Sequence, residues 1–218
     1  MARVMASAII LAGGRSRRLG GFKALVELCG RPMISYALEA VSGLASDVVV
    51  VVSSEEQARA LRASGALGDA RIAMDRPGLG PSCPLLGLSS GLSEAGGQEA
   101  LVLACDMPLA SRQGLSLLVE ILSHMNAVVP RWPNGYVEPL QAVYKVGPAL
   151  RASEEALRSG GAVDMRSFLR ALGRVRYVST RMLEELDPGL NTFLNVNTPA
   201  DLRRAEYALR ARGACGGH

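Results

Sequence analysis

The chain has 218 residues, 49% of them hydrophobic and 20% charged, a balance that excludes a mainly disordered protein. Its apolar runs are shorter than the ~20 residues that span a bilayer, and an aromatic content of 4% requires an aliphatic core. The net charge is +4, but most arginines are interspersed with acids, which predicts a solvated surface and no nucleic-acid partner.

Short β-branched runs alternate with helical patterns along the chain. In chain order, we expect strands at residues 4–11, 47–52, 70–74, 99–105, 127–130, 139–145 and 175–179. Between and after them, we expect helices at residues 32–41, 55–63, 84–94, 115–124, 149–157, 165–172 and 199–212. The apolar start of the chain is interpreted as the first strand and not as a signal peptide.

This alternation predicts a doubly wound α/β fold, with a mostly parallel sheet and helices on both faces. The unbroken valines at residues 48–52 are typical of a strand covered on both sides. An Asn-Gly turn at 134–135 precedes the 139–145 strand, which we expect to run antiparallel to its neighbour. We expect one domain over 1–218, with a nucleotide-binding half at about 1–108 and an acceptor-binding half at about 109–212.

The cysteines form no C-x-x-C pair, and no histidine lies at metal-binding spacing from them. The sequence therefore predicts reduced, mostly buried thiols in a cytoplasmic protein with no membrane partner. The four positions are Cys29, Cys83, Cys105 and Cys215. His124, expected within a helix, and His218 receive no role.

A glycine-rich, basic segment at residues 11–23, LAGGRSRRLGGFK, directly follows the first predicted strand. Adjacent Gly13 and Gly14 let the backbone approach a ligand and present successive N–H groups to an anion. The spacing matches neither the Walker A loop nor the G-x-G-x-x-G fingerprint. A tight turn with solvated arginines would explain the glycines but not the local density of charge, so the segment predicts polyphosphate binding. Its cationic residues are Arg15, Arg17, Arg18 and Lys23.

Three further segments carry candidate site residues. Asp106 directly follows an apolar strand, where a carboxylate either caps a turn or binds Mg²⁺ with substrate phosphates. Asp75 begins a Gly/Pro-rich loop that fits a binding site and a plain surface turn equally well. Asn195 and Asn197 precede a helix start at Thr198, and their amides could ligate a metal or orient a phosphate.

Taken together, these segments resemble the glycosyltransferase-A-type nucleotidyltransferases, and among them the molybdenum cofactor (molybdopterin) guanylyltransferases. The resemblance rests on the 11–23 segment, on Asp106-Met-Pro, on the 138–144 segment EPLQAVY and on the 193–202 segment FLNVNTPADL. It implies a nucleotide-diphospho-sugar-transferase-like, Rossmann-like fold. It also implies transfer of GMP from GTP to molybdenum–molybdopterin, with release of pyrophosphate, and transient contact with other molybdenum cofactor proteins.

The resemblance, together with the charge and position of the residues, implies roles for individual residues. Lys23, Arg15, Arg18 and Asp106 are expected to be catalytic, and Asp106 to hold Mg²⁺ together with Asn195 and Asn197. Glu138 is expected either to bind the acceptor with Asn195 and Asn197 or to be an exposed strand residue. The expected nucleotide-binding residues are Leu11, Ala12, Gly13, Gly14, Lys23, Ser53, Asp75 and Asp106.

Two departures from the family pattern stand out. The 80–87 segment GPSCPLLG carries residues beyond the family's G-P-L-x-G, and Ser53 stands where many relatives have Asn. The 28–34 segment LCGRPMI resembles guanylyltransferases that act on adenosylcobinamide phosphate, which leaves that acceptor as an alternative.

Other functions remain open at this point. A molybdopterin cytidylyltransferase would share the same loop, so the sequence leaves guanine and cytosine undecided. A non-catalytic GTP-binding sensor would not need Asp106, Asn195 and Asn197. A dinucleotide-dependent oxidoreductase is disfavoured by the missing G-x-G-x-x-G.

Overall fold

The computed structural model describes residues 5–16, 18–159 and 164–215. Arg17 and His218 therefore lie outside the described residues. No helix in these ranges is both long enough and apolar enough to cross a membrane.

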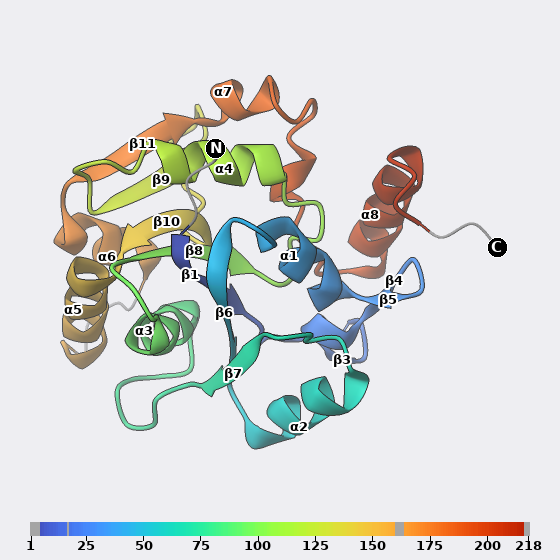
Figure 1. Ribbon diagram of the computed structural model, residues 1–218, viewed down its shortest axis with the longest axis horizontal. Coiled ribbons are helices and arrows are strands. Elements are labelled where there is room, and N and C mark those ends of the chain that lie inside the picture. Colours follow the sequence, from blue (N-terminus) through green and yellow to red (C-terminus); the bar gives the residue numbers. More distant parts are fainter. Residues whose placement is uncertain (1–4, 17, 160–163, 216–218) are drawn as a thin grey trace.

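Within the described ranges, a seven-stranded sheet runs in the order β11-β9-β10-β8-β1-β6-β7 (Figure 1). β1 pairs in parallel with β6 and with β8, whereas β10 is antiparallel to both β8 and β9. The predicted mostly parallel sheet and the antiparallel 139–145 strand are thus confirmed. The strands are β1 (Met5–Leu11), β6 (Ala45–Val52), β7 (Arg71–Met74), β8 (Glu99–Ala104), β9 (Ala127–Arg131), β10 (Gln141–Lys145) and β11 (Val175–Ser179).

Both faces of the sheet are covered because the central strands alternate large aliphatic side chains between two cores. In β1, Ile10 packs into one core and Ile9 into the other. The first core takes buried residues from α1 (Met33–Val41), α2 (Glu55–Ser64) and α4 (Arg112–Glu120). The second takes them from α3 (Pro84–Glu94), α5 (Val146–Arg158) and α6 (Met165–Leu172).

The order of the strands places a crevice at one edge of the sheet. From β1 the chain moves outward through β6 and β7, then returns to β8 on the other side of β1. Such a reversal leaves an opening at the carboxyl ends of the strands, where ligands bind in open α/β sheets. Leu11, at the end of β1, is in register with Val51 of β6 and Ala104 of β8.

The last helix, α8 (Pro199–Ala211), lies outside the two main layers. Its start carries the predicted signals, because Thr198 and Asp201 form a capping box around Pro199. Ala205 and Leu209 of α8 pack with Leu28 and neighbouring apolar residues in a third, smaller core. Figure 1 shows α8 beside the hairpin of β4 (Glu27–Leu28) and β5 (Arg31–Pro32), on the side away from α5 and α6.

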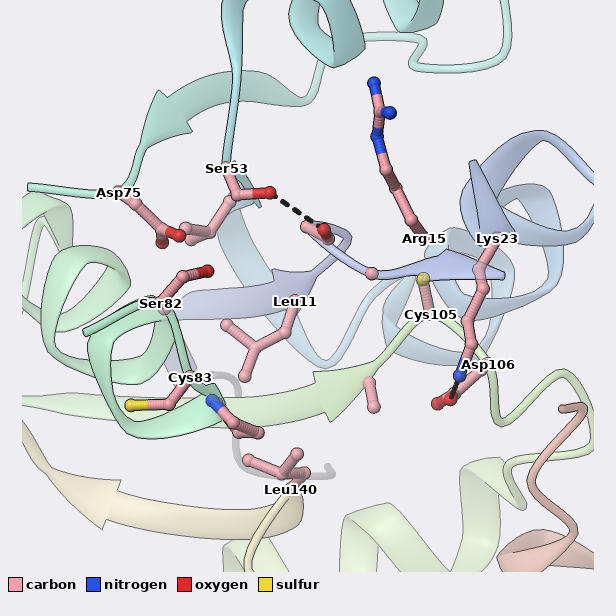
Figure 2. A pocket seen from close by; sticks show the side chains of 16 residues that line it. Leu11, Arg15, Lys23, Ser53, Asp75, Ser82, Cys83, Cys105, Asp106 and Leu140 are labelled. Atoms are coloured by element: carbon pink, nitrogen blue, oxygen red, sulfur yellow. Dashed lines mark hydrogen bonds and ion pairs between the residues drawn. The ribbon is translucent and has the colours of Figure 1, made fainter. Parts of the chain in front are cut away.

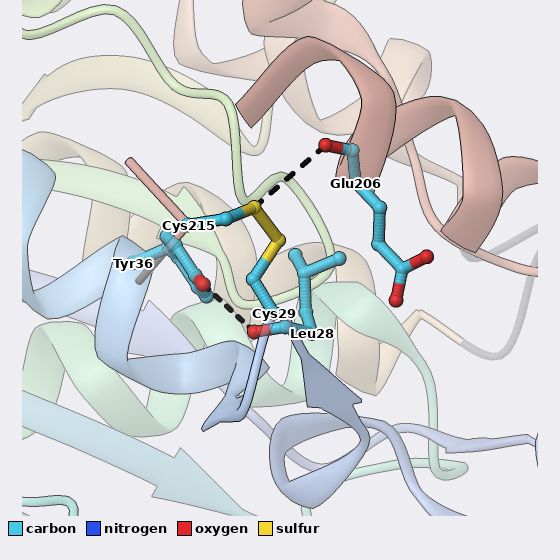
Figure 3. Close-up of a disulfide and its surroundings, with 5 residues drawn as sticks. All are labelled: Leu28, Cys29, Tyr36, Glu206 and Cys215. Carbon is cyan, nitrogen blue, oxygen red and sulfur yellow. Dashed lines mark hydrogen bonds between the residues drawn. A yellow bond between two sulfur atoms is a disulfide. The ribbon is translucent and has the colours of Figure 1, made fainter. Parts of the chain in front are cut away.

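A disulfide joins that hairpin to the segment that follows α8 (Figure 3). Cys29 and Cys215 are bonded with their Cα atoms 5.2 Å apart, across a sequence separation of 186. The prediction that all thiols are reduced is therefore wrong for this pair, because tertiary contacts bring together cysteines that lie near opposite ends of the sequence. Cys105 is a buried free thiol whose pKa is raised by burial, and Cys83 is a half-buried free thiol.

A few elements differ from expectation. Helix α4 ends at Glu120, and His124 lies in a following turn where Ser123 has a positive φ of 42°. The expectation of a helix through His124 is therefore wrong. The short elements absent from the prediction are β2 (Arg15–Ser16), β3 (Gly21–Phe22), β4, β5, α7 (Thr180–Glu184) and the 3₁₀ turns η1 (Lys23–Leu25) and η2 (Asn191–Phe193).

Candidate nucleotide-binding site

A cavity of about 500 Å³ opens at the carboxyl ends of β1, β6, β7 and β8 (Figure 2). Charged side chains stand at its two ends and an apolar floor lies between them. Figure 2 shows Lys23 meeting Asp106 on one side, with Asp75 and Ser82 across the cavity. The lining residues that were predicted from the sequence are Leu11, Gly13, Gly14, Arg15, Lys23, Ser53, Asp75 and Asp106.

Hydrogen bonds hold the glycine segment against the start of α2 and the 3₁₀ turn η1. The carbonyl of Gly13 accepts hydrogen bonds from Ser53 Oγ (2.8 Å) and Gln57 Nε2 (2.9 Å). The carbonyl of Gly14 accepts one from the backbone N–H of Lys23 (3.2 Å). A Cβ on Gly14 would lie 3.3 Å from Lys23 Cδ, so glycine allows the lysine to cross the loop.

Lys23 is the central cation of the site. Its ammonium donates to Asp106 Oδ2 at 2.8 Å and also to Asn197 Oδ1. The side chains of Lys23 and Asp106 are each 17% exposed, which makes their ion pair less screened by solvent than a surface pair. The structure thus brings together three residues that lie far apart in the sequence.

The Asn195–Asn197 segment is fixed to Asp106 through the backbone. The N–H of Val196 donates to the carbonyl of Asp106 at 2.8 Å, and the Val196 side chain is buried. Asn197 is fixed from the other side, because its N–H donates to Asp201 in the capping box. The start of α8 therefore positions Asn197 beside Asp106.

These groups fit a divalent cation. Asp106 and Asn197 supply hard oxygen donors, and both oxygens already converge on one positive group, the Lys23 ammonium. In the described ranges, no group of three or more His, Cys, Asp or Glu side chains is arranged so that it could hold a metal ion. A single carboxylate is typical of Mg²⁺, which takes most of its other ligands from water and substrate phosphates.

Asp75 occupies the opposite end of the cavity. Its backbone N–H continues the β6–β7 pairing to Val52, but its carboxylate has no hydrogen bond or ion pair within the described residues. Burial raises the pKa of Asp75 from 3.8 to about 6. A half-buried carboxylate without a partner among the described residues is suited to receiving N–H donors from a ligand.

The two arginines predicted to be catalytic, Arg15 and Arg18, are less directly placed at the site than Lys23 is. The Arg15 guanidinium pairs with Glu56 on α2 and stacks over Phe22, with its centre 4.8 Å from the ring centroid. Arg18 is exposed in the turn between β2 and β3 and is not among the lining residues. Ala12 is buried in the first core, so only its backbone could reach a ligand.

Glu138 is 8% exposed, which contradicts the alternative that it is an exposed strand residue. Its carboxylate accepts a hydrogen bond from Trp132 Nε1 at 2.7 Å. Burial raises the pKa of Glu138, and this hydrogen bond partly opposes the rise. Trp132 in turn packs edge-on against Phe193, which ties the 131–138 turn to the segment carrying Asn195.

Leu140 and Gln57 were not predicted from the sequence. Leu140 contributes to the apolar lining, and Gln57 holds the Gly13 carbonyl although it is only 1% exposed itself. The extra residues of the 80–87 segment place Ser82 and Cys83 in the lining. The only sequence signal for Gln57 is its position three residues after Ser54, which is typical of a helix cap.

The sequence of this chain is similar to those of a known family and of several curated proteins. Residues 8–175 match the family described as the MobA-like NTP transferase domain. A probable molybdenum cofactor guanylyltransferase from Methanothermobacter thermautotrophicus is 36% identical over 203 residues, covering 90% of this chain and 97% of the relative. A molybdenum cofactor guanylyltransferase from Desulfosudis oleivorans is 36% identical over 206 residues, covering 93% and 95%.

Solved structures agree with this relationship. A crystal structure of molybdopterin-guanine dinucleotide biosynthesis protein A from Archaeoglobus fulgidus has a TM-score of 0.78 at 31% identity. It covers 94% of this chain and 99% of its own. A 4-diphosphocytidyl-2C-methyl-D-erythritol synthase from Anaerococcus prevotii has a TM-score of 0.70 at 17% identity, covering 95% and 96%, and so shares the fold.

Proposed function

This chain belongs to the MobA-like NTP transferase family, and we propose that it transfers GMP from GTP to molybdenum–molybdopterin, forming the guanine dinucleotide cofactor and pyrophosphate. The observation that carries the proposal is the polarity of the cavity. A lysine, an aspartate and an asparagine meet at one end, and a carboxylate without a partner in the described chain stands at the other. A nucleoside triphosphate has the same polarity, with phosphates at one end and a base at the other.

The phosphates belong at the Lys23 end. The N–H groups of the Gly13–Gly14 segment and the Lys23 ammonium supply positive charge there. The Asp75 carboxylate would accept the two N–H donors on the Watson–Crick edge of guanine. Cytosine offers a single amino group on that edge, so this arrangement favours GTP over CTP.

The reaction needs positioning more than a side-chain nucleophile. An oxygen of the acceptor's terminal phosphate attacks the α-phosphorus and forms a new P–O bond. The bond from the α-phosphorus to the bridging oxygen breaks, and the electron pair leaves with pyrophosphate. Lys23 would stabilise the charge that develops on this leaving group. The attacking phosphate is already ionised near neutral pH, so no general base is required.

Mg²⁺ would be held by the oxygens of Asp106 and Asn197, with Asn195 as a further proposed donor. When bound, the metal would neutralise charge on the phosphates. The Lys23 ammonium bonds to both of these oxygens, so binding of the metal by Asp106 and Asn197 would require Lys23 to turn toward the phosphates. The acceptor would lie on the side of Glu138 and Asn195, where the 131–138 turn meets η2.

Calorimetric titration with GTP, CTP and ATP, each with and without Mg²⁺, tests this assignment. We expect the tightest binding for GTP with Mg²⁺, and we expect Asp106→Asn to remove the effect of Mg²⁺ while retaining binding of metal-free GTP. Preference for CTP would contradict the guanylyl assignment. A full Mg²⁺ effect in Asp106→Asn would contradict the metal assignment.

A further inference from the structure

Gln57 of α2 contacts the glycine-rich segment at Gly13 from outside the cavity. It is 1% exposed and is not among the residues that line the cavity. Its side-chain Oε1 accepts the backbone N–H of Ser53 at 2.8 Å, and its Nε2 donates to the Gly13 carbonyl at 2.9 Å. The N–H of Ser53 is a donor only, so the amide oxygen must face it, which leaves the amide nitrogen facing Gly13.

The Ser53 hydroxyl does not replace the Gln57–Gly13 hydrogen bond in every orientation. Its hydroxyl lies 2.8 Å from the Gly13 carbonyl and 2.9 Å from Gln57 Oε1, but it has one proton to donate. The Gln57 amide therefore supplies the hydrogen bond that holds the Gly13 carbonyl in either hydroxyl orientation. Gly13 and Ser53 pack closely, since a Cβ on Gly13 would lie 3.1 Å from Ser53 Oγ.

Holding this carbonyl also fixes the next peptide N–H. The peptide bond is planar, and no cis peptide occurs in the described ranges, so the Gly13 carbonyl and the Gly14 N–H point in opposite directions. The carbonyl faces Ser53 and Gln57, so the Gly14 N–H faces away from them. That N–H has no partner among the described residues, and Gly14 lines the cavity beside Lys23.

We infer that Gln57 is a positioning residue that aims the Gly14 N–H at the phosphates of the nucleotide. The inference rests on the proposed function, because that function places the triphosphate at this end of the cavity. Gln57 touches no substrate itself and acts through the Gly13 peptide. Released from Gln57, this peptide could rotate and present its carbonyl oxygen to the phosphates, where an anion would be repelled.

Gln57 also contributes to the start of α2, and this second role needs its own control. Ser54 is the N-cap, and its side chain accepts the Gln57 N–H at 3.3 Å. A Ser54→Ala variant weakens the same helix start without removing a bond to Gly13. A Gln57→Glu variant, assayed at a pH where its carboxylate is ionised, keeps an acceptor for the Ser53 N–H but has no donor for the Gly13 carbonyl. A Gln57→Met variant removes both bonds without adding charge.

The test compares GTP, inorganic tripolyphosphate and guanosine by calorimetry, together with the Tm of each variant. We expect Gln57→Glu and Gln57→Met to weaken binding of GTP and tripolyphosphate roughly tenfold, with guanosine affinity unchanged within about twofold. We expect Ser54→Ala to lower the Tm while leaving the ratio of GTP to guanosine affinity as in the wild type.

Three results would overturn the inference: wild-type affinity for tripolyphosphate in both Gln57 variants, equal weakening of guanosine, or the same selective loss in Ser54→Ala. A wild-type protein that binds tripolyphosphate but not GTP contradicts the proposed function alone. In that case, the Gln57 variants and the wild type are compared by their affinity for tripolyphosphate. Absence of binding to both by the wild type would overturn both proposals.

Discussion

Lys23 bonds to side chains that come from two distant parts of the chain. Its partners Asp106 and Asn197 lie 83 and 174 residues away in sequence. The other lysine, Lys145, pairs with Glu99 and does not line the cavity. The two lysines therefore form a matched pair for mutation, one at the proposed phosphate site and one remote from it.

Lys23→Ala should lower the turnover number by about 10²-fold or more, because the leaving pyrophosphate loses its nearest fixed cation. Lys145→Ala should leave turnover unchanged. Steady-state rates of pyrophosphate release from both variants provide the measurement. Wild-type turnover in Lys23→Ala would remove the proposed role of this lysine.

Asp75 gives the site a dependence on pH. Burial raises its pKa from 3.8 to about 6, so the carboxylate is protonated in much of the population at pH 5 and ionised at pH 7. GTP affinity should rise across this range, since only the ionised form accepts both guanine N–H groups. Asp75→Asn should lose this rise, and the comparison removes the nucleotide's own titration. An identical pH profile in the variant would contradict the role of Asp75.

The same pKa predicts an effect on stability with a definite sign. The folded chain holds the Asp75 proton more tightly than the unfolded chain, so between pH 4 and 6 the folded state binds more protons. The contribution of Asp75 to the free energy of unfolding is therefore largest below pH 4 and declines as pH rises through about 6. Asp75→Asn should remove this part of the pH dependence in denaturant titrations of the free protein.

Among the elements, those that carry the sheet could be predicted from sequence. The predicted bounds of α3 and α6 match the structure, and the cap at Thr198 was evident from its residues. The β2–β3 and β4–β5 hairpins could not be predicted, because strands of two residues are too short to show an alternating pattern. These hairpins flank Lys23, so the backbone that supports part of the site could not be predicted from hydrophobic periodicity.

The β4–β5 turn shows why Cys29 is unusual. Cys29 and Gly30 both have positive φ angles, of 48° and 75°, in a two-residue turn that favours Asn-Gly or Asp-Gly. A cysteine here pays a conformational cost that Asn would avoid. The bond to Cys215 gives the position a structural reason and ties α8 to the hairpin that follows Lys23.

Cys215→Ser should lower the free energy of unfolding by about 2–4 kcal/mol, because the closed loop spans most of the chain. Reductant should lower the Tm of the wild type and leave that of the variant unchanged. Cys83→Ser, which alters a free thiol, serves as the control and should respond to reductant as the wild type does. A wild-type Tm that does not change with reductant would contradict a stabilising disulfide.

At the scale of the whole molecule, sequence patterns predicted the layers but not the order of the strands. The valine run of β6 and the apolar β1 and β8 indicated a buried parallel sheet. The insertion of β10 between β8 and β9, antiparallel to both, depends on long-range pairing that local patterns do not record. The strand order in turn sets which loops meet at the cavity.

The candidate site was likewise only partly predictable from the sequence. Residues directly after predicted strands, such as Gly13, Asp75 and Asp106, could be assigned to one sheet edge in advance. Gln57 could not, because its bond to Gly13 spans 44 residues and starts from a helix that carries no visible signature of the site. Residue types identify the chemistry of such a site, whereas the supporting contacts need the tertiary structure.

The proposed guanylyl transfer requires both substrates. The direct measurement is pyrophosphate release by the purified chain with GTP and Mg²⁺, in the presence and absence of molybdenum–molybdopterin. We predict release of pyrophosphate only when the acceptor is present, together with formation of the guanine dinucleotide. We predict little release when CTP replaces GTP. Equal release without acceptor, or equal release from CTP, would contradict it.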